Sequence, residues 1–480
     1  MIIIHKYENT FINPIPLPDY PHGLRLDKGA VGREHKIEYR EFGDPSALYE
    51  DNKWYLYGSA GMVFWTEDYK HWNYTKVLLG GEEIGAPTIV KHNDIFYCIA
   101  NGSMLYEASS PLGPFKSIGR LKNCQGEELR VNDPMYFSDD DGRLYLYYGC
   151  GEGIRGVEVD ANNPAQFLGE PIFFFADNTR EHVWERMGAN NEDGSFSWVE
   201  GAWMFKHNGM YYLTYCAPNT EFPTYAMGAY KSKTPLGPFE YMETSPFITK
   251  KYGTFKGAGH GSIVKGPNDT VWAFYTGCIG YANFVERFVG MQPIGFDDNG
   301  DIIPTVADGT PQWIPGVKEN PHEGNNAGLV PITSFRTHVA SSEMPGRDGI
   351  YALDENALSW WQPLPEDKEP SLTVDTLIYR GKSELMLYAA RVVWRYIGMD
   401  VMGGKLPTPV KYRIEALTPE EKWVCILDKT DNQEDMYFDY QLLMPTYAKK
   451  VRLVITERPK DMEVGVIDFS VYGKWEPICK

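Results

Sequence analysis

The sequence predicts an all-β protein, a five-bladed β-propeller followed by a smaller β-sandwich. Three observations predict this fold class. Aromatic residues make up 14% of the 480 residues, and 47 glycines and 33 prolines interrupt them; aromatic residues favour strands, whereas Gly and Pro favour turns. One hairpin pattern recurs five times. Beyond about residue 310 this pattern stops and different strand signals begin.

Each repeat consists of an apolar strand, a polar turn containing Asn or Asp, and an aromatic strand, which is typical of tight β-hairpins. The five repeats are Asp44–Ser59, Ala86–Asn101, Asp133–Gly149, Glu200–Cys216 and His260–Gly277. Their second strands can be aligned on Tyr55, Tyr97, Tyr145, Tyr212 and Trp272. The resulting spacings of 42, 48, 67 and 60 residues suit one four-stranded blade per repeat, with insertions in the later blades. A sandwich of several hairpins is the alternative, but it gives no reason for five copies of one hairpin.

The chain is predicted to divide into a propeller over 1–315, a linker over 316–340 and a sandwich over 341–480. The linker region is rich in Pro, Gly, Asn and Glu, which favour irregular structure. The predicted sandwich has strand signals at Ser371–Asp375, Lys411–Ala416, Val451–Thr456 and Val464–Tyr472.

The charge balance excludes several classes of partner. The chain has 65 acidic and 46 basic side chains and a formal net charge of −19, which argues against binding to nucleic acid or to an anionic membrane surface. No apolar run approaches the roughly 18 residues of a membrane span. The seven cysteines lack disulfide-framework spacing, and the apolar stretch Met1–Ile4 is too short for a signal peptide. We therefore expect a reduced, cytoplasmic protein; its oligomeric state stays open.

The residue that opens the first strand of each repeat carries the functional signal. In a propeller the innermost strands surround the central axis, so equivalent positions near their starts converge at one mouth. These positions hold Asp44, Ala86, Asp133, Glu200 and His260. Asp-Pro and Glu-Gly can also serve only to start turns. Three carboxylates and a histidine at equivalent positions nevertheless predict a catalytic or ligand-binding site.

Converging carboxylates suit the hydrolysis of a glycosidic bond in a neutral oligosaccharide. An inverting hydrolase needs a carboxylic acid that protonates the leaving oxygen and a carboxylate that activates water, roughly 6.5–9.5 Å apart. A third carboxylate raises the pKa of the acid by repulsion. Nearby aromatic residues are candidates for stacking on a sugar ring, although such residues are more often core: Trp203, Trp184, Phe64 and Trp65.

The ordered motifs Asp44-Pro-Ser, Asp133-Pro, Glu200-Gly and Gly259-His-Gly-Ser262 resemble glycoside hydrolase family 43 over about residues 40–300. The resemblance implies a five-bladed propeller that inverts the anomeric centre and acts as a β-xylosidase or an α-L-arabinofuranosidase. It also implies Asp44 as the general base, Asp133 as the modulator of pKa and Glu200 as the general acid.

Further roles follow from the same resemblance. His260 resembles an axial histidine that holds a water or a metal ion, often calcium, although no cofactor is expected to be required. Arg287 resembles an arginine that contacts the substrate. In the loop His182–Gly188, Glu185 and Arg186 are expected either to line the pocket or to form an ion pair within the loop.

The C-terminal part resembles a discoidin-like (coagulation factor 5/8 type C) sandwich. The residues that carry this likeness include Leu372-Thr-Val-Asp375, Tyr412-Arg-Ile-Glu415 and Phe469-Ser-Val-Tyr-Gly473. Such modules often bind carbohydrate. A purely structural module packed on the propeller is an equally open alternative.

Taken together, the residues predict an inverting, exo-acting glycoside hydrolase that releases a terminal arabinofuranose or xylose from plant-type oligosaccharides such as those of hemicellulose. One alternative is a retaining, fructan-cleaving propeller hydrolase, but Gly201 follows the acid where that class usually has cysteine. Another is a non-catalytic carbohydrate-binding propeller, against which the three ionisable side chains speak. The sequence does not choose the sugar.

Overall fold

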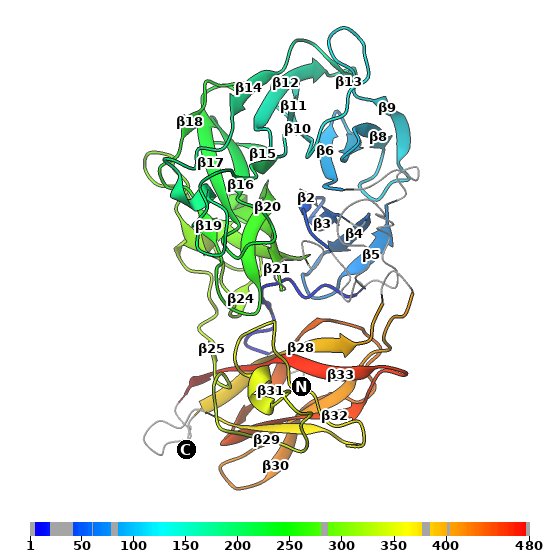
Figure 1. The fold of residues 1–480 in the computed structure, drawn as a ribbon, viewed down its shortest axis with the longest axis vertical. Helices are drawn as coiled ribbons and strands as arrows, with labels where there is room; N and C mark the ends of the chain where they lie inside the picture. The colour runs from blue at the N-terminus through cyan, green and yellow to red at the C-terminus, as the bar shows by residue number, and fades with distance from the viewer. Residues whose placement is uncertain are drawn as a thin grey trace.

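The computed structural model describes residues 5–19, 42–59, 61–77, 85–279, 287–376, 385–400 and 404–476. They form two β domains, a propeller of five small sheets and a two-sheet sandwich below it in Figure 1. The predicted all-β class is confirmed. Among the described residues, no helix has the length and apolar character needed to cross a membrane.

Blades one to three follow one another along the chain, and each contains antiparallel neighbouring strands. Blade one consists of β2 (Ser46–Glu50), β3 (Lys53–Gly58), β4 (Met62–Thr66) and β5 (Asn73–Lys76). Blade two consists of β6 (Thr88–His92), β7 (Ile95–Ile99), β8 (Met104–Ala108) and β9 (Lys116–Arg120). Blade three consists of β10 (Met135–Ser138), β11 (Leu144–Tyr148), β12 (Ile154–Asp160), β13 (Asn163–Phe167) and β14 (Ile172–Phe175).

Blades four and five complete the ring (Figure 1). Blade four follows the short helix η1 (Val183–Glu185) and consists of β15 (Glu200–His207), β16 (Met210–Ala217), β17 (Ala226–Ser232), β18 (Glu240–Tyr241), β19 (Ile248–Thr249) and β23 (Thr305–Val306). Blade five consists of β20 (Lys256–Lys265), β21 (Val271–Cys278) and β22 (Arg287–Ile294), with η2 (Pro267–Asp269) between its first two strands. In all five blades the first two strands pair as the predicted hairpins, which confirms the repeat.

The chain turns sharply where it enters each inner strand. At each of these five entries one residue has a positive φ: 52° at Asp44, 45° at Ala86, 50° at Asp133, 64° at Gly201 and 31° at His260. Left-handed backbone costs a non-glycine residue roughly 1–2 kcal/mol, so its recurrence marks a shared geometric requirement. These turns bring the entry residues of all five blades to one small cavity on the propeller axis.

The sandwich packs two sheets face to face around a core that includes the fully buried Trp361 and Trp394. One sheet has the order β25 (Val330–Pro331), β33 (Glu463–Trp475), β28 (Leu385–Ile397) and β31 (Phe438–Tyr447). The other has the order β26 (His338–Ala340), β27 (Ser371–Asp375), β32 (Lys450–Glu457), β29 (Lys411–Leu417) and β30 (Trp423–Lys429). The short helices η3 (Pro321–Glu323) and η4 (Gly349–Ala352) lie before and within this domain.

The segment 316–340 differs from the linker that composition predicted. Strands β25 and β26 lie within it, and both pair with strands of the sandwich. Its Pro and Gly residues surround short edge strands, where Pro is tolerated because one side of the strand needs no partner. The outer limits of the two domains stay a prediction.

The N-terminal segment lies between the two domains (Figure 1). Its strand β1 (Thr10–Phe11) pairs with β24 (Gln312–Trp313). The Asn13 amide donates to the carbonyl of Met291 in blade five at 2.8 Å, and the Asn13 carbonyl accepts from Arg391 of the sandwich at 3.4 Å. These contacts join the domains through residues at the opposite end of the chain from the sandwich.

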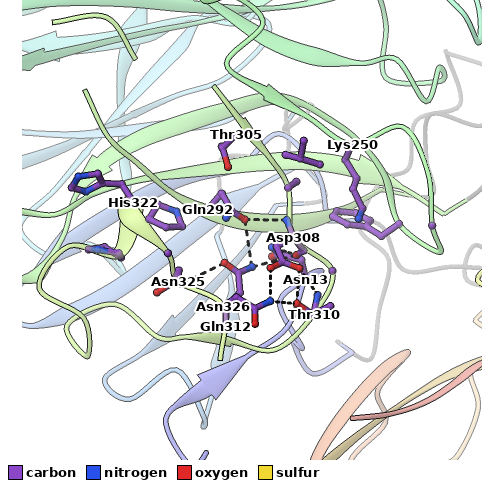
Figure 2. Close-up of a pocket in the computed structure, with 18 of the residues that line it drawn as sticks. Asn13, Lys250, Gln292, Thr305, Asp308, Thr310, Gln312, His322, Asn325 and Asn326 are labelled. Carbon is purple, nitrogen blue, oxygen red and sulfur yellow. Dashed lines mark hydrogen bonds between the residues drawn. The ribbon is translucent and has the colours of Figure 1, made fainter. Parts of the chain in front are cut away.

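A cavity of about 530 Å³ lies beside this junction. Its walls come from blade four, blade five, the connection around η3 and the sandwich (Figure 2).

Candidate active site

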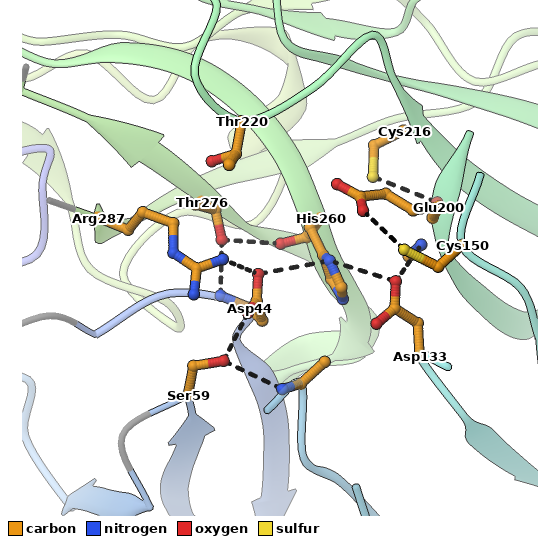
Figure 3. Close-up of polar contacts among 12 residues, drawn as sticks. Asp44, Ser59, Asp133, Cys150, Glu200, Cys216, Thr220, His260, Thr276 and Arg287 are labelled. Carbon is orange, nitrogen blue, oxygen red and sulfur yellow. Dashed lines mark hydrogen bonds and ion pairs between the residues drawn. The ribbon is translucent and has the colours of Figure 1, made fainter. Parts of the chain in front are cut away.

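Asp44 is held by polar contacts at the entrance to β2 (Figure 3). Its backbone N–H donates to the Thr276 hydroxyl at 2.7 Å. Its Oδ2 accepts from the Ser59 hydroxyl at 2.5 Å, and its Oδ1 lies 2.7 Å from Nη1 of Arg287 and 3.4 Å from Nδ1 of His260. Two cationic neighbours favour the charged form of a carboxyl group. Asp44 therefore has the fixed position and the surroundings that a general base requires.

Asp133 occupies the equivalent position in blade three. Its N–H donates to the Asn101 side-chain oxygen at 2.7 Å, and its Oδ2 accepts from the N–H of Gly201 at 3.3 Å and lies 4.0 Å from Nδ1 of His260. Burial raises the pKa of Asp133; the charge of His260 opposes this rise and the charge of Asp44 adds to it. The carboxyl group thus contacts the backbone next to Glu200 and lies near His260, which also contacts Asp44.

Glu200 is the first residue of β15, and protein atoms surround most of its carboxyl group although the residue is partly exposed. Its Oε1 accepts from the Tyr225 hydroxyl at 2.6 Å, and its Oε2 accepts from the Cys150 thiol at 3.3 Å. A carboxylate oxygen of Asp133 lies within 4.8 Å of one of Glu200. Burial first, and repulsion from Asp133 second, raise the pKa of Glu200 to about 7. Such a carboxyl group can donate a proton near neutral pH.

His260 lies between these carboxylates. Burial alone would lower the pKa of its imidazole, but the charges of Asp44, Asp133 and Glu200 raise it above the ordinary value of 6.5. The histidine thus offsets part of the negative charge at the axis.

The axial cavity has the size of one water molecule. Its volume is about 10 Å³, and its walls include Asp44, Asp133, Trp203 and His260. A Ca²⁺ ion takes six to eight oxygen ligands at about 2.3–2.6 Å, whereas these walls offer one imidazole and carboxylates that already have donors. The residues fit a bound water and offer too few free oxygens to ligate calcium directly, and an ion held through water near His260 stays a prediction.

Two of the four predicted stacking residues are buried. Phe64 is only 1% exposed and packs edge-on against Phe42, with ring centroids 4.7 Å apart. Trp203 is 7% exposed, donates its indole N–H to the carbonyl of Ile263 at 3.0 Å and forms a wall of the axial cavity. Burial contradicts the stacking role of Phe64, whereas Trp203 lines the axial cavity and its contact with a sugar stays a prediction.

Trp65 and Trp184 are half-buried. Trp65 packs against the hydrophobic cluster that blades one and two share. The Trp184 indole N–H donates to the Tyr241 hydroxyl at 3.0 Å, and its ring packs so closely on Gly228 that a Cβ there would come within 2.5 Å. Stacking of a sugar on either ring stays a prediction.

The loop before Glu200 is fixed by a buried carboxylate. Glu185 is 1% exposed and lies 2.6 Å from the Tyr215 hydroxyl and 2.8 Å from Nδ1 of His182. Arg186 instead donates to the carbonyl of Thr179 at 2.8 Å. Glu185 therefore anchors the loop to blade four, which is neither of the two roles expected for it.

Three further residues contact the carboxylates and were not predicted. Ser59 touches Asp44, and Tyr225 and Cys150 touch Glu200. Ser59 ends the first hairpin repeat, which Asp44 begins, so its position in the repeat could have predicted its contact with Asp44. Tyr225 and Cys150 lie in connections whose course only the folded chain defines.

Residues 36–302 match the family model described as Glycosyl hydrolases family 43. A xylosidase/arabinosidase of Butyrivibrio fibrisolvens is 24% identical over 242 residues, which cover 44% of this chain and 43% of that protein. A β-D-galactofuranosidase of Aspergillus niger is 28% identical over 225 residues, which cover 44% of this chain and 58% of that protein. The chain thus spans about half the length of these curated relatives.

One solved structure, titled as a glycoside hydrolase, has a TM-score of 0.50 and 18% sequence identity, and the match covers 90% of this chain and 97% of that chain. At this identity the likeness shows the fold alone. The family model, by contrast, covers more than half of the chain, including all three carboxylates of the propeller mouth. The chain therefore belongs to glycosyl hydrolase family 43.

Proposed function

We propose that the protein is an inverting, exo-acting glycoside hydrolase that releases a terminal arabinofuranose or xylose from plant-type oligosaccharides. One observation carries this proposal. At one propeller mouth, Glu200 has a pKa of about 7, whereas Asp44 is held by Arg287 and His260. Two carboxyl groups in such different surroundings suit an acid and a base.

In the proposed reaction Glu200 donates its proton to the glycosidic oxygen as the bond to the anomeric carbon breaks. Asp44 accepts a proton from a water whose oxygen attacks the opposite face of that carbon. The product has the inverted configuration, Glu200 ends as a carboxylate and Asp44 ends protonated. Asp133 contributes by keeping Glu200 protonated in the resting enzyme.

The sugar is suggested by the relatives. Two similar proteins are named as xylosidases or arabinosidases, from Butyrivibrio fibrisolvens and Bacteroides ovatus, at 24% and 29% identity. The relative from Aspergillus niger is named as a β-D-galactofuranosidase. A set of aryl glycosides should therefore contain α-L-arabinofuranoside, β-D-xyloside and β-D-galactofuranoside, with hydrolysis of either pentoside as the expected result.

Two experiments test the mechanism. Proton NMR of the first product anomer should show inversion; retention would favour the fructan-cleaving alternative. Asp44→Asn and Glu200→Gln should each lower turnover by about 10²–10⁴-fold. The control is Asp140→Asn, a carboxylate whose side chain is 86% exposed in blade three. Full activity of both site variants would refute this site, and no hydrolysis of any glycoside would favour a binding propeller.

The discoidin-like character of the sandwich and a cytoplasmic location belong to the same proposal. The contact of the sandwich with Asn13 joins two parts of the same chain and involves no external ligand, which suits a structural role for the sandwich.

A further inference from the structure

The cavity beside the domain junction has the size of a small-molecule site. Its volume of about 530 Å³ lies within the usual range of roughly 300–1,000 Å³ for ligand pockets. Side chains from both domains and from the segments that connect their strands line it, as Figure 2 shows in part: Lys250, Thr254, Gln292, Asn325, Arg391 and Tyr472.

This cavity is separate from the catalytic mouth. None of the residues Asp44, Asp133, Glu200, His260 and Arg287 is among the described residues that line it. Strand β22 places Arg287 at its first position and Gln292 five residues later. At the rise of an extended strand this is a separation of about 16 Å.

Three polar groups at the cavity have no partner among the residues that the structure describes. The Thr254 hydroxyl and the Asn325 side-chain oxygen are buried without a hydrogen bond in the described part of the chain. Lys250 likewise makes no hydrogen bond or ion pair there, and burial lowers the pKa of its ammonium group. Each buried polar group without a partner costs roughly 1–3 kcal/mol. Two of them, together with the half-buried Lys250 ammonium at the same cavity, indicate a ligand that supplies the missing bonds.

The charges of the wall favour a neutral ligand. Lys250 and Arg391 face Asp308 and Glu355, and the more exposed Glu323 adds a third carboxylate at the wall. Arg391 is already engaged, with its Nε 3.0 Å from Oδ2 of the buried Asp468. An anion would meet the three carboxylates of the wall, and a cation would meet Lys250.

The unpartnered groups also define the chemistry of the ligand. Lys250 can only donate, the Asn325 oxygen can only accept, and the Thr254 hydroxyl can do both. Sugar hydroxyl groups donate and accept equally well. The remaining wall includes the apolar side chains of Phe255 and Ile303, against which the C–H face of a sugar can pack.

The polar wall is fixed before any ligand arrives. The Gln292 side-chain oxygen accepts from the N–H of Asp308 at 3.2 Å and from the Gln312 amide at 3.4 Å. The Asn325 amide group donates to the carbonyl of Trp313 at 2.8 Å, which leaves its oxygen free to face a ligand. Such preorganisation reduces the entropy lost on binding.

We propose that this cavity is a second carbohydrate site, which binds a neutral mono- or disaccharide through the Lys250 ammonium, the Thr254 hydroxyl and the Asn325 amide oxygen. It is distinct from the site of hydrolysis and is built jointly by the propeller and the sandwich.

Isothermal titration calorimetry on the full chain tests this proposal. The protein carries Glu200→Gln, which prevents turnover, and the probes are xylobiose, L-arabinose and sodium D-glucuronate. We expect two binding events for at least one neutral sugar. Thr254→Val and Lys250→Met should each weaken one event by at least tenfold and leave the other unchanged.

The controls are Thr244→Val, which removes another buried hydroxyl without a partner, and Lys251→Met, the neighbouring lysine that bonds Asn190 instead. Both should keep two events. The replaced groups of Thr254 and Lys250 make no hydrogen bond within the described part of the chain, so the thermal midpoint should not fall. Three results would each overturn the proposal. These are a single binding event for every neutral sugar when the cavity is unmodified, unchanged isotherms in both cavity variants, and a preference for D-glucuronate. Turnover of an aryl pentoside by the unmodified protein tests the hydrolase function separately, so either proposal can fail alone.

Discussion

Replacement of Asp133 by asparagine tests how the propeller sets the acidity of Glu200. Asparagine removes one negative charge and little else, because its carbonyl can still accept from the Gly201 N–H and it tolerates the left-handed backbone at this position. Glu200 must be protonated to act as an acid, so activity falls as the pH rises through its pKa of about 7. A lower pKa in Asp133→Asn should therefore move the alkaline limb of the pH profile to lower pH.

The size of this shift follows from two competing causes. Two unit charges 4.8 Å apart at an effective dielectric constant of about 20 repel by about 3.5 kcal/mol. At about 1.4 kcal/mol per pH unit, this would account for the whole rise from 4.5 to about 7. Burial is the larger cause, however, and the charge of His260 opposes the rise. We therefore expect a shift of about one pH unit.

The assay is the pH dependence of kcat/KM on an unactivated disaccharide or methyl glycoside. Such leaving groups need full protonation, whereas 4-nitrophenol needs little, so the shift should be smaller with an aryl glycoside. Asp140→Asn serves as the control and should keep the original profile. An alkaline limb that superimposes on that of the unmodified enzyme would refute the role given to Asp133.

The Tyr225 hydroxyl donates to Glu200 and thereby lowers the pKa of Glu200, so Tyr225→Phe should raise that pKa and move the alkaline limb to higher pH. The control is Tyr275→Phe, whose hydroxyl has no partner among the described residues, and it should leave the alkaline limb in place. Glu200→Gln should stabilise the protein by about 1–3 kcal/mol at pH 8 but not at pH 4, because a carboxyl group whose pKa is raised on folding destabilises the fold progressively between pH 4.5 and 7. Chemical denaturation at both pH values measures the free energy of unfolding. An equal change in that free energy at both pH values would contradict the prediction. Arg391→Met leaves Asp468, 1% exposed, without its cation and should cost about 3–5 kcal/mol in the same measurement, whereas an unchanged midpoint would show that the pair contributes nothing.

The local patterns of the sequence were enough to predict the propeller and its carboxylates. Hairpin register depends on residues close in sequence, so the alternation and the turn residues were sufficient for all five hairpins. The carboxylates followed because equivalent positions in a repeated unit meet at one axis. Asp44, Asp133 and Glu200 therefore come together with His260 at the mouth, as the repeat predicted.

Other features depend on contacts between distant segments. Strand β28 spans 13 residues that are apolar apart from Arg391 and Arg395, a pattern that does not separate a buried strand from a buried helix. Whether Phe64 faced the mouth or the core depended on how blade one packs against Phe42, which the sequence does not specify. The cavity at the junction needs residues as far apart as Asn13 and Tyr472, so no local pattern could predict it.

The position of the N-terminal segment limits how this protein can be recombined. Because Asn13 bonds both Met291 of blade five and Arg391 of the sandwich, a chimera joined only after residue 315 would leave Asn13 against a foreign surface. Tyr7 would be affected in the same way, since it packs with Leu329 and Tyr472. A successful graft of another sandwich must therefore exchange residues 5–19 together with the sandwich. We also expect the amino-acid sequences of residues 5–19 and of the sandwich to have changed together during evolution.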